Sequence, residues 1–194
     1  MTTSDRKIGL FGGTFDPVHL GHLEIASRAV DALGLDEVRF LPCRLSPHKT
    51  GAAPPAGGGD RVAMLRLATR GLPWAVVDDF ELRTPPPSYS VLTAGEMRRR
   101  FPDARLFWIL GRDQWEALPR WRNPARLAEL VEFIVFARDG EPQPRPGWRM
   151  HRVAGDHPAS ATAIREAVAR GQAPPDWLPA GVADYIAQHR LYEA

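Results

Sequence analysis

The sequence predicts an α/β fold, namely a Rossmann-like doubly wound parallel sheet with helices on both faces and a small C-terminal helical segment. Two observations lead to this prediction. Short apolar runs of strand length alternate along the chain with segments whose apolar residues recur at helical spacing. The connections between successive runs are long enough to hold the helical crossover that a parallel pair of strands requires.

The first forty residues have the pattern of one strand–helix–strand unit. Lys7–Phe11 is an apolar run that predicts a strand, and apolar residues at helical spacing predict a helix over Leu20–Leu33, ended by Gly34. A second strand is expected over Val38–Leu41, before Pro42. These two strands should therefore be parallel neighbours.

The alternation of helix and strand continues to the end of the chain. Three helix-and-strand pairs are expected at Arg61–Thr69 with Trp74–Val77, Val91–Arg100 with Arg105–Leu110, and Ala125–Leu130 with Phe133–Ala137. A further strand over Trp148–Val153 and helices over Thr162–Ala169 and Val182–His189 follow. Two stretches rich in Gly or Pro, Gly51–Gly59 and Glu141–Gly147, are expected to be surface loops within one domain of residues 1–194.

Composition and charge exclude several classes of protein. The chain has 194 residues, 44% of them hydrophobic and 25% charged, which is typical of a soluble globular protein. Its 25 basic and 23 acidic residues leave a net charge of +2, so no nucleic-acid partner is expected. Cys43 is the only cysteine, which excludes a disulfide framework and a cysteine-based zinc site and leaves this residue a structural role. No apolar run is long enough to span a bilayer, and the polar start lacks the layout of a signal peptide, so we expect a cytoplasmic protein without a membrane partner.

The first expected strand runs directly into the segment Gly12-Gly13-Thr14-Phe15-Asp16-Pro17-Val18-His19-Leu20-Gly21-His22. A Gly-Gly pair lets a phosphate approach the backbone, and the helix that follows offers free N–H groups and a positive dipole end. His19 and His22 are three residues apart, so both imidazoles can face one side, with Gly21 leaving room for a ligand. As imidazolium, they would stabilise the charge that develops in a transition state. An ordinary turn with two surface histidines is the alternative, but the two histidines and Thr14 close together favour an anion site.

Other nucleotide signatures are missing from the sequence. No G-x-G-x-x-G follows the first strand, and neither G-x-x-x-x-G-K-[ST] nor G-x-S-x-G occurs, which disfavours dehydrogenases, P-loop enzymes and α/β-hydrolases.

The segment from Gly12 to His22 resembles the signature of the nucleotidylyltransferase superfamily, whose members join a nucleoside triphosphate to a phosphate-bearing acceptor through an H-x-G-H motif. Later segments make the chain similar to bacterial nicotinate-nucleotide adenylyltransferases: Pro47-His48-Lys49, Glu81-Leu82-Arg83 with Pro87-Ser88-Tyr89-Ser90, Gly111-Arg112-Asp113 with Trp121, and Ser160-Ala161-Thr162-Ala163-Ile164-Arg165. The resemblance covers nearly the whole chain and ends at Val182-Ala183-Asp184-Tyr185-Ile186.

This resemblance implies an enzyme of NAD biosynthesis that transfers the adenylyl group of ATP to nicotinate mononucleotide, giving nicotinate adenine dinucleotide and pyrophosphate. It implies a catalytic role for His19 and His22. The residues that it assigns to ATP are Gly12, Gly13, Thr14, Phe15, Asp113, Ser160, Thr162 and Arg165, and those that it assigns to the acceptor are Lys49, Tyr89, Ser90 and Trp121.

The phosphate-side residues also have plainer interpretations. Lys49 can clamp phosphate oxygens or be a solvated surface lysine, although lysine is rare in this chain. Ser160 and Thr162 can cap a helix, and the same position lets hydroxyl and amide groups donate to a phosphate. Arg165 would add a guanidinium for the triphosphate, and Arg138 either helps or is solvated.

The residues at the acceptor and ribose ends leave similar alternatives open. Asp113 can accept hydrogen bonds from ribose hydroxyls or cap a loop. Trp121 is expected near the pyridine ring by resemblance, although a tryptophan is more often a core residue. Tyr89 and Ser90 match the segment that faces the nicotinate, where backbone donors can bind the carboxylate.

The expected strand order places all of these loops together. The turn at residues 12–22 and the loops at 42–49, 81–90 and 111–121 each leave the carboxyl end of a parallel strand. Open α/β sheets bind ligands at that edge, so the four segments should converge on one crevice.

The expected reaction is an in-line attack of the acceptor phosphate on the α-phosphorus of ATP. Because the attacking phosphate is already anionic, no general base and no covalent intermediate are needed. Mg²⁺ should arrive with ATP, since the sequence has no cluster dedicated to a metal, and a site built from Asp16, His19 and His22 is the less favoured alternative.

Three positions depart from the family pattern, namely Leu92, Arg112 and Ala161, which puts substrate preference more in doubt than catalysis. Arg112 adds a phosphate contact or points to solvent. The alternative acceptors are nicotinamide mononucleotide or another phosphate-bearing compound, and a non-catalytic nucleotide sensor is the alternative from another class. A homo-oligomer is left open.

Overall fold

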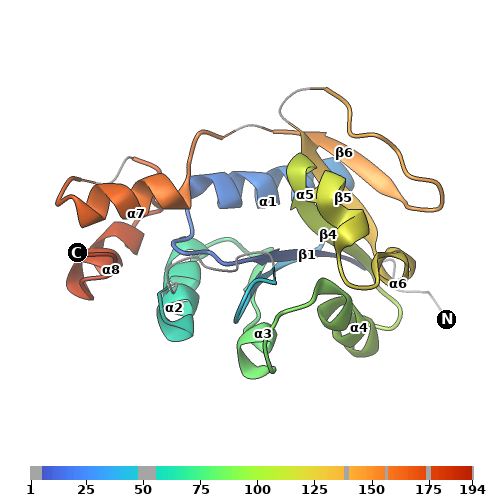
Figure 1. Ribbon diagram of the computed structural model, residues 1–194, viewed down its shortest axis with the longest axis horizontal. Helices are drawn as coiled ribbons and strands as arrows, with labels where there is room; N and C mark the ends of the chain where they lie inside the picture. Colours follow the sequence, from blue (N-terminus) through green and yellow to red (C-terminus); the bar gives the residue numbers. More distant parts are fainter. Residues whose placement is uncertain (1–5, 48–55, 138–139, 156, 174–175, 194) are drawn as a thin grey trace.

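The computed structural model describes residues 6–47, 56–137, 140–155, 157–173 and 176–193 (Figure 1). Six strands form one sheet, and each neighbouring pair is parallel. The strands are β1 (Lys7–Gly13), β2 (Glu37–Pro42), β3 (Ala75–Val77), β4 (Arg105–Gly111), β5 (Glu132–Ala137) and β6 (Met150–Ala154). The helices are α1 (Leu20–Leu33), α2 (Gly58–Ala68), α3 (Phe80–Arg83), α4 (Ser90–Arg100), α5 (Arg112–Ala117), the 3-10 helix η1 (Leu118–Arg120), α6 (Pro124–Leu130), α7 (Ala161–Ala169) and α8 (Val182–Gln188).

The strand order β3-β2-β1-β4-β5-β6 confirms the doubly wound α/β fold. The chain adds strands outward from β1 on one side and then returns to add β4, β5 and β6 on the other. The order therefore reverses between β1 and β4, and a sheet of this kind opens a crevice beyond the carboxyl ends of those two strands.

Two hydrophobic clusters cover the two faces of the sheet. Buried side chains of α1, α2 and α8 pack with Phe11, Phe40, Phe107 and Ile134 on one face. Those of α4, α5 and α6 pack with Ile8, Leu10, Trp108 and Phe133 on the other. Figure 1 shows α1 and α4 on opposite sides of β1. The alternation of side chains along each strand explains why both faces are apolar.

Most expected elements are present, and three details differ from the sequence prediction. β1 runs through the expected turn to Gly13, because Gly12 and Gly13 still pair with β2. α2 begins at Gly58, inside the stretch expected to be a loop; residues 51–55 of that stretch lie outside the described residues. The short helices α3 and α5, of four and six residues, stand where only loops were expected.

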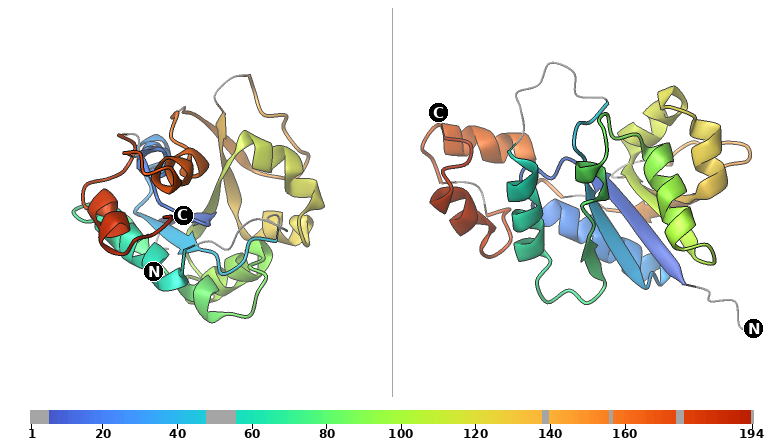
Figure 2. Two further views of the ribbon diagram at one scale, coloured as in Figure 1. Left: turned by 60° about the vertical axis from the view of Figure 1, so that its left-hand side comes forward. Right: turned by 90° about the horizontal axis from the view of Figure 1, so that it is seen from below.

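The C-terminal helices lie at the same end of the molecule as the carboxyl edge of β1. α8 contacts α2, and Figure 2 shows α7 and α8 together beside α2. This position brings the last residues of the chain to the loop that follows β1. Within the described part of the chain, no helix is both long and apolar enough to cross a membrane.

Candidate active site

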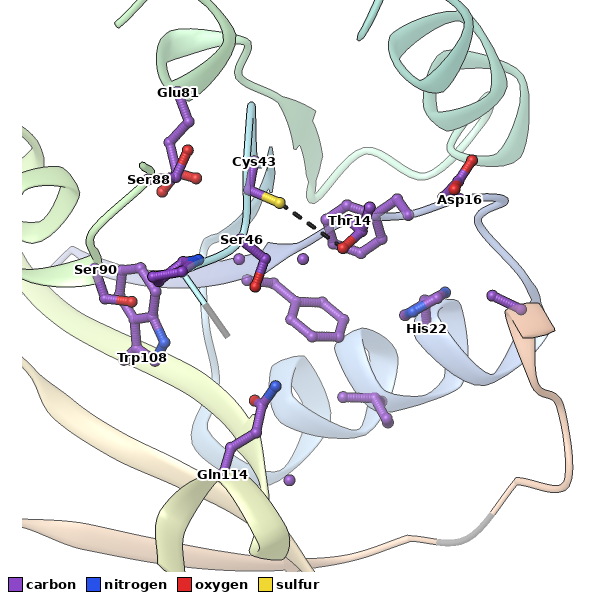
Figure 3. Close-up of a pocket in the computed structure, with 18 of the residues that line it drawn as sticks. Thr14, Asp16, His22, Cys43, Ser46, Glu81, Ser88, Ser90, Trp108 and Gln114 are labelled. Atoms are coloured by element: carbon purple, nitrogen blue, oxygen red, sulfur yellow. Dashed lines mark hydrogen bonds between the residues drawn. The ribbon is translucent and has the colours of Figure 1, made fainter. Parts of the chain in front are cut away.

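A cavity of about 340 Å³ lies over the carboxyl ends of β1, β2 and β4 (Figure 3). Its walls come from the segment after β1, from Cys43–Pro47, from the segment between α3 and α4, from the start of α5 and from α7. The loops expected to converge on one crevice do so, as far as they are described. Nine of the residues predicted for ATP, the acceptor or catalysis line this cavity: Gly12, Gly13, Thr14, Phe15, His22, Ser90, Asp113, Trp121 and Arg165. Lys49 and Arg138 lie outside the described residues.

His22 lies in the first turn of α1 and faces the cavity. The backbone N–H of His19 donates a hydrogen bond of 3.2 Å to Nδ1 of His22. Since Nδ1 accepts this bond, the neutral ring carries its proton on Nε2. Phe15 packs edge-on against the imidazole, with ring centres 5.0 Å apart. His22 is thereby fixed in orientation.

His19 has a different environment, although its ring stacks on that of His22 with centres 3.7 Å apart. It is 8% exposed and lines a separate small cavity of about 80 Å³ with Gly21 and His157. Burial, and then the proximity of His157, lower the pKa of His19 to about 4. Nδ1 of His19 has no hydrogen-bond partner among the described residues. The ring is neutral at neutral pH, which differs from the pair of imidazolium groups that the sequence suggested.

The glycines of the motif accommodate aromatic and imidazole rings of this chain. A Cβ at Gly21 would lie 3.2 Å from the His19 ring and 3.3 Å from Cβ of His157, so this glycine makes room for these two side chains. A Cβ at Gly12 would lie 3.1 Å from Trp108, and one at Gly13 would lie 3.0 Å from the Phe15 ring. The backbone of β1 can therefore reach the floor of the cavity only because these positions lack side chains.

Phe15 contributes to the site mainly through packing. Its side chain is 2% exposed and belongs to the core, and its φ of 51° lies in the left-handed region that non-glycine residues rarely adopt. This backbone conformation turns the chain sharply after β1 and points Phe15 under His22.

Asp16 ties the loop after β1 to distant parts of the chain. Its Oδ1 accepts hydrogen bonds from Ala56 N–H at 2.9 Å and from the Tyr192 hydroxyl at 2.7 Å. Arg165 donates from Nη1 to the backbone oxygen of Asp16 at 2.6 Å. Burial and the Asp16 carboxylate raise the pKa of Tyr192, which keeps this hydroxyl a donor. The carboxylate of Asp16 thus braces the loop, which speaks against the metal site considered with His19.

Arg61 holds the same loop from beneath, and the sequence prediction missed it. It is 2% exposed, and its guanidinium donates to the carbonyl oxygens of Thr14 at 2.7 Å and Ala56 at 3.0 Å. A buried arginine needs such partners, and the two carbonyls that it satisfies join the loop after β1 to the segment before α2. An arginine at the fourth position of an apolar helix was the only signal in the sequence.

At the start of α7, one residue caps the helix and another lines the cavity. Ser160 is the N-cap residue and accepts from Ala163 N–H at 3.4 Å, while Thr162 Oγ1 accepts from Arg165 at 3.3 Å. Neither hydroxyl lines the cavity in this structure, whereas Arg165 does. The phosphate contacts expected of Ser160 and Thr162 stay predictions.

A second cavity of about 360 Å³ is lined by Pro47, Tyr89, Ser90, Arg120, Trp121 and Arg122. Pro47, Ser90 and Trp121 also line the first cavity, so the two cavities adjoin. Asp113 lies in the first turn of α5, facing the first cavity. Arg112 pairs with Glu116 along α5 at 2.8 Å. Of the other departures from the family pattern, Leu92 is 57% exposed and Ala161 lines the first cavity.

Glu81 and Ser88 join the loops near the second cavity, and the sequence analysis assigned no specific role to either. Glu81 is buried and accepts a hydrogen bond from the Thr93 hydroxyl at 2.6 Å. Ser88 Oγ accepts from Arg44 N–H at 3.0 Å, and Ser88 N–H donates to the oxygen of Leu45 at 3.0 Å. Burial raises the pKa of Glu81, against the effect of hydrogen bonds from Thr93 and Ser88. This network fixes the turn that carries Tyr89 and Ser90.

Among the described residues, no group of three or more His, Cys, Asp or Glu side chains is placed to hold a metal ion.

Comparisons with known proteins identify the family and agree with this fold. The family description "Cytidylyltransferase-like" matches residues 10–167. A protein of Aeromonas salmonicida named "Probable nicotinate-nucleotide adenylyltransferase" is 39% identical over 217 residues, covering 96% of this chain and 97% of its own length. One of the same name from Thermus thermophilus is 39% identical, covering 96% and 99%. The solved structure of Plasmodium falciparum nicotinic acid mononucleotide adenylyltransferase complexed with NaAD shares the fold, with a TM-score of 0.76, 17% identity and coverage of 96% and 97%.

Proposed function

Since this chain belongs to the cytidylyltransferase-like family, we propose that its crevice transfers the adenylyl group of ATP to nicotinate mononucleotide, giving nicotinate adenine dinucleotide and pyrophosphate in NAD biosynthesis. The observation that carries the proposal is that two cavities adjoin at this edge of the sheet and share Pro47, Ser90 and Trp121 as lining residues. One cavity holds His22, Arg165 and the loop after β1, and the other opens between Tyr89 and Trp121. A site for two joined nucleotides needs this length.

The reaction is the displacement of pyrophosphate from the α-phosphorus of ATP by a phosphate oxygen of the acceptor. The acceptor oxygen is already negative, so the protein has to orient two anions and stabilise the charge of the leaving group. We assign His22 as a donor to phosphate and Arg165, which lines the same cavity, as a positive charge for it. His19 supports this role, because its backbone N–H sets the orientation of the His22 ring.

Mg²⁺ is proposed to enter as the ATP complex, where it shields the charge of the triphosphate. The described residues fit such an arrangement, because the carboxylates lining the crevice are dispersed, and Asp16 already binds Ala56 and Tyr192.

The substrate contacts are proposed by position. Gly12, Gly13, Thr14, Phe15 and Asp113, with Ser160, Thr162 and Arg165 of the α7 segment, are assigned to ATP. Tyr89, Ser90, Trp121 and Lys49 are assigned to the acceptor. The substrates are small molecules, and we place the reaction in the cytoplasm.

The test is pyrophosphate release with ATP and Mg²⁺, with nicotinate mononucleotide or nicotinamide mononucleotide as acceptor. Preference for the acid supports the proposal. Preference for the amide overturns the choice of acceptor, and ATP binding without release with any acceptor would favour a sensor.

Replacing His22 by Ala should lower kcat by about 100-fold or more while leaving the unfolding temperature nearly unchanged. His189→Ala, which removes an exposed histidine of the segment after α8, is the control and should retain full turnover. Wild-type turnover in the His22 variant would refute the role given to this side chain.

A further inference from the structure

The second cavity has a charge distribution that its neighbour lacks. Its six lining residues include two arginines, Arg120 and Arg122, and no acidic side chain. The first cavity, by contrast, is lined by Asp16, Glu81 and Asp113 as well as by basic groups. A ligand group that enters the second cavity therefore meets positive charge only, from the residues that line it in the described structure.

One of the two guanidinium groups is held next to an aromatic ring. Arg122 lies over the face of Tyr89, with its guanidinium carbon 4.6 Å from the ring centre. Such a cation–π contact orients the planar group and leaves its N–H donors at the edge free to bind an anion. Trp121, between the two arginines in sequence, lines the same cavity and adds a second aromatic surface.

The backbone that carries these side chains is anchored on both sides. Leu118 of η1 and Leu127 of α6 are both fully buried, and the N–H of Trp121 donates to the oxygen of Leu118 at 3.0 Å. Pro124 begins α6 directly after this segment. The arginines are therefore on a short, fixed connection and not on a long loop.

An aromatic ring that bears a carboxylate fits this combination of two aromatic surfaces and two cations. We propose that Arg122, assisted by Arg120, determines the preference for the acid over the amide form of the acceptor; this inference rests on the function proposed above. The pyridine ring of both mononucleotides is a cation at its quaternary nitrogen. In the acid form the carboxylate balances that charge, whereas the amide form brings an unbalanced cation next to two guanidiniums.

Selection therefore has an attractive and a repulsive component. The guanidinium of Arg122 donates to the carboxylate in a planar, two-bond geometry that an amide cannot match. The same positive charge disfavours the pyridinium of the amide substrate. The family resemblance implies that backbone N–H groups near Ser90 bind the same carboxylate. The arginines would add the positive charge that distinguishes the acid from the amide.

The experiment compares kcat/KM for the two acceptors in wild type, Arg122→Gln, Arg122→Lys and the double variant Arg120→Gln/Arg122→Gln. Removing both charges should lower kcat/KM for nicotinate mononucleotide by about tenfold, mainly through KM, and leave or raise that for the amide. Lys at 122 should have an intermediate effect, because it keeps the charge and loses the planar group. The KM for ATP should not change in any of them, since neither arginine lines the first cavity.

Arg126→Gln is the matched control, because it removes an exposed arginine of α6 that pairs with Glu129 and lines neither cavity. It should keep the wild-type ratio of acid to amide. If the wild type prefers the acid and the double variant keeps the full preference, the inference is wrong while the proposed function stands. If the wild type uses neither acceptor or prefers the amide, both are wrong.

Discussion

The neutral, buried state of His19 predicts how the stability of this protein depends on pH. Folding lowers the pKa of His19 from 6.5 to about 4, so the unfolded chain takes up a proton at a pH where the folded chain does not. The stability is therefore complete above about pH 6.5 and decreases as the pH falls towards 4. Each unit of pKa shift corresponds to about 1.4 kcal/mol, so the lowered pKa of His19 contributes about 3 kcal/mol to the free energy of unfolding at high pH. About 2 kcal/mol of this contribution is lost between pH 7 and pH 5.

The assay is urea unfolding at pH 7 and pH 5 of wild type and His19→Gln. The variant cannot take up this proton, so its loss of stability over the interval should be about 2 kcal/mol smaller than that of wild type. The titratable groups around position 19, namely His22, His157 and Glu24, are present in both proteins, so the difference between the two reports on position 19. His189→Gln removes an exposed histidine distant from this site and should keep the wild-type loss. An equal loss in wild type and His19→Gln would refute the argument.

Three further predictions concern the residues that brace the crevice. Arg61→Met should destabilise the protein by about 2–3 kcal/mol in urea unfolding and raise the KM for ATP, because it leaves the carbonyl of Thr14 without its buried donor. Tyr192→Phe should cost about 1–2 kcal/mol in the same assay, through the lost hydrogen bond to Asp16. Glu81→Ala should raise the KM for the acceptor and lower the free energy of unfolding by about 2 kcal/mol. Glu81→Gln should keep both quantities near the wild-type values, because it retains an oxygen acceptor for the hydroxyls of Thr93 and Ser88 and removes a buried charge.

The Arg61 prediction has a matched comparison in the same helix, and each of the three predictions has an outcome that would contradict it. Arg66→Met removes an exposed arginine from the same helix as Arg61 and should change stability by less than about 0.5 kcal/mol. Equal effects at positions 61 and 66 would contradict the bracing role. For Tyr192, an unchanged midpoint would show that the contact with Asp16 adds nothing to stability. Equivalent behaviour of Gln and Ala at position 81 would exclude an acceptor role for that oxygen.

The order of helices and strands could be predicted from the sequence because it depends on local patterns. Burial produces a pattern that is visible within a few residues, as in the apolar run Lys7–Phe11 and the helical spacing over Leu20–Leu33. The helices α3 and α5 were missed, since four and six residues are too few to show a period. The motif of residues 12–22 could be placed at the carboxyl edge of the sheet in the same way, because it directly follows the first expected strand.

The sequence alone determined the fold class, the family resemblance and the segments that meet at the crevice. Only the tertiary structure decided which polar groups support one another there, as Tyr192 reaches Asp16 across 176 positions and Arg61 reaches Thr14 across 47. It also decided that His19 is buried and neutral while its neighbour in the motif faces the cavity. The physical reason is that a strand or helix follows from the spacing of nearby residues, whereas burial and hydrogen-bond partners depend on which distant segments pack together.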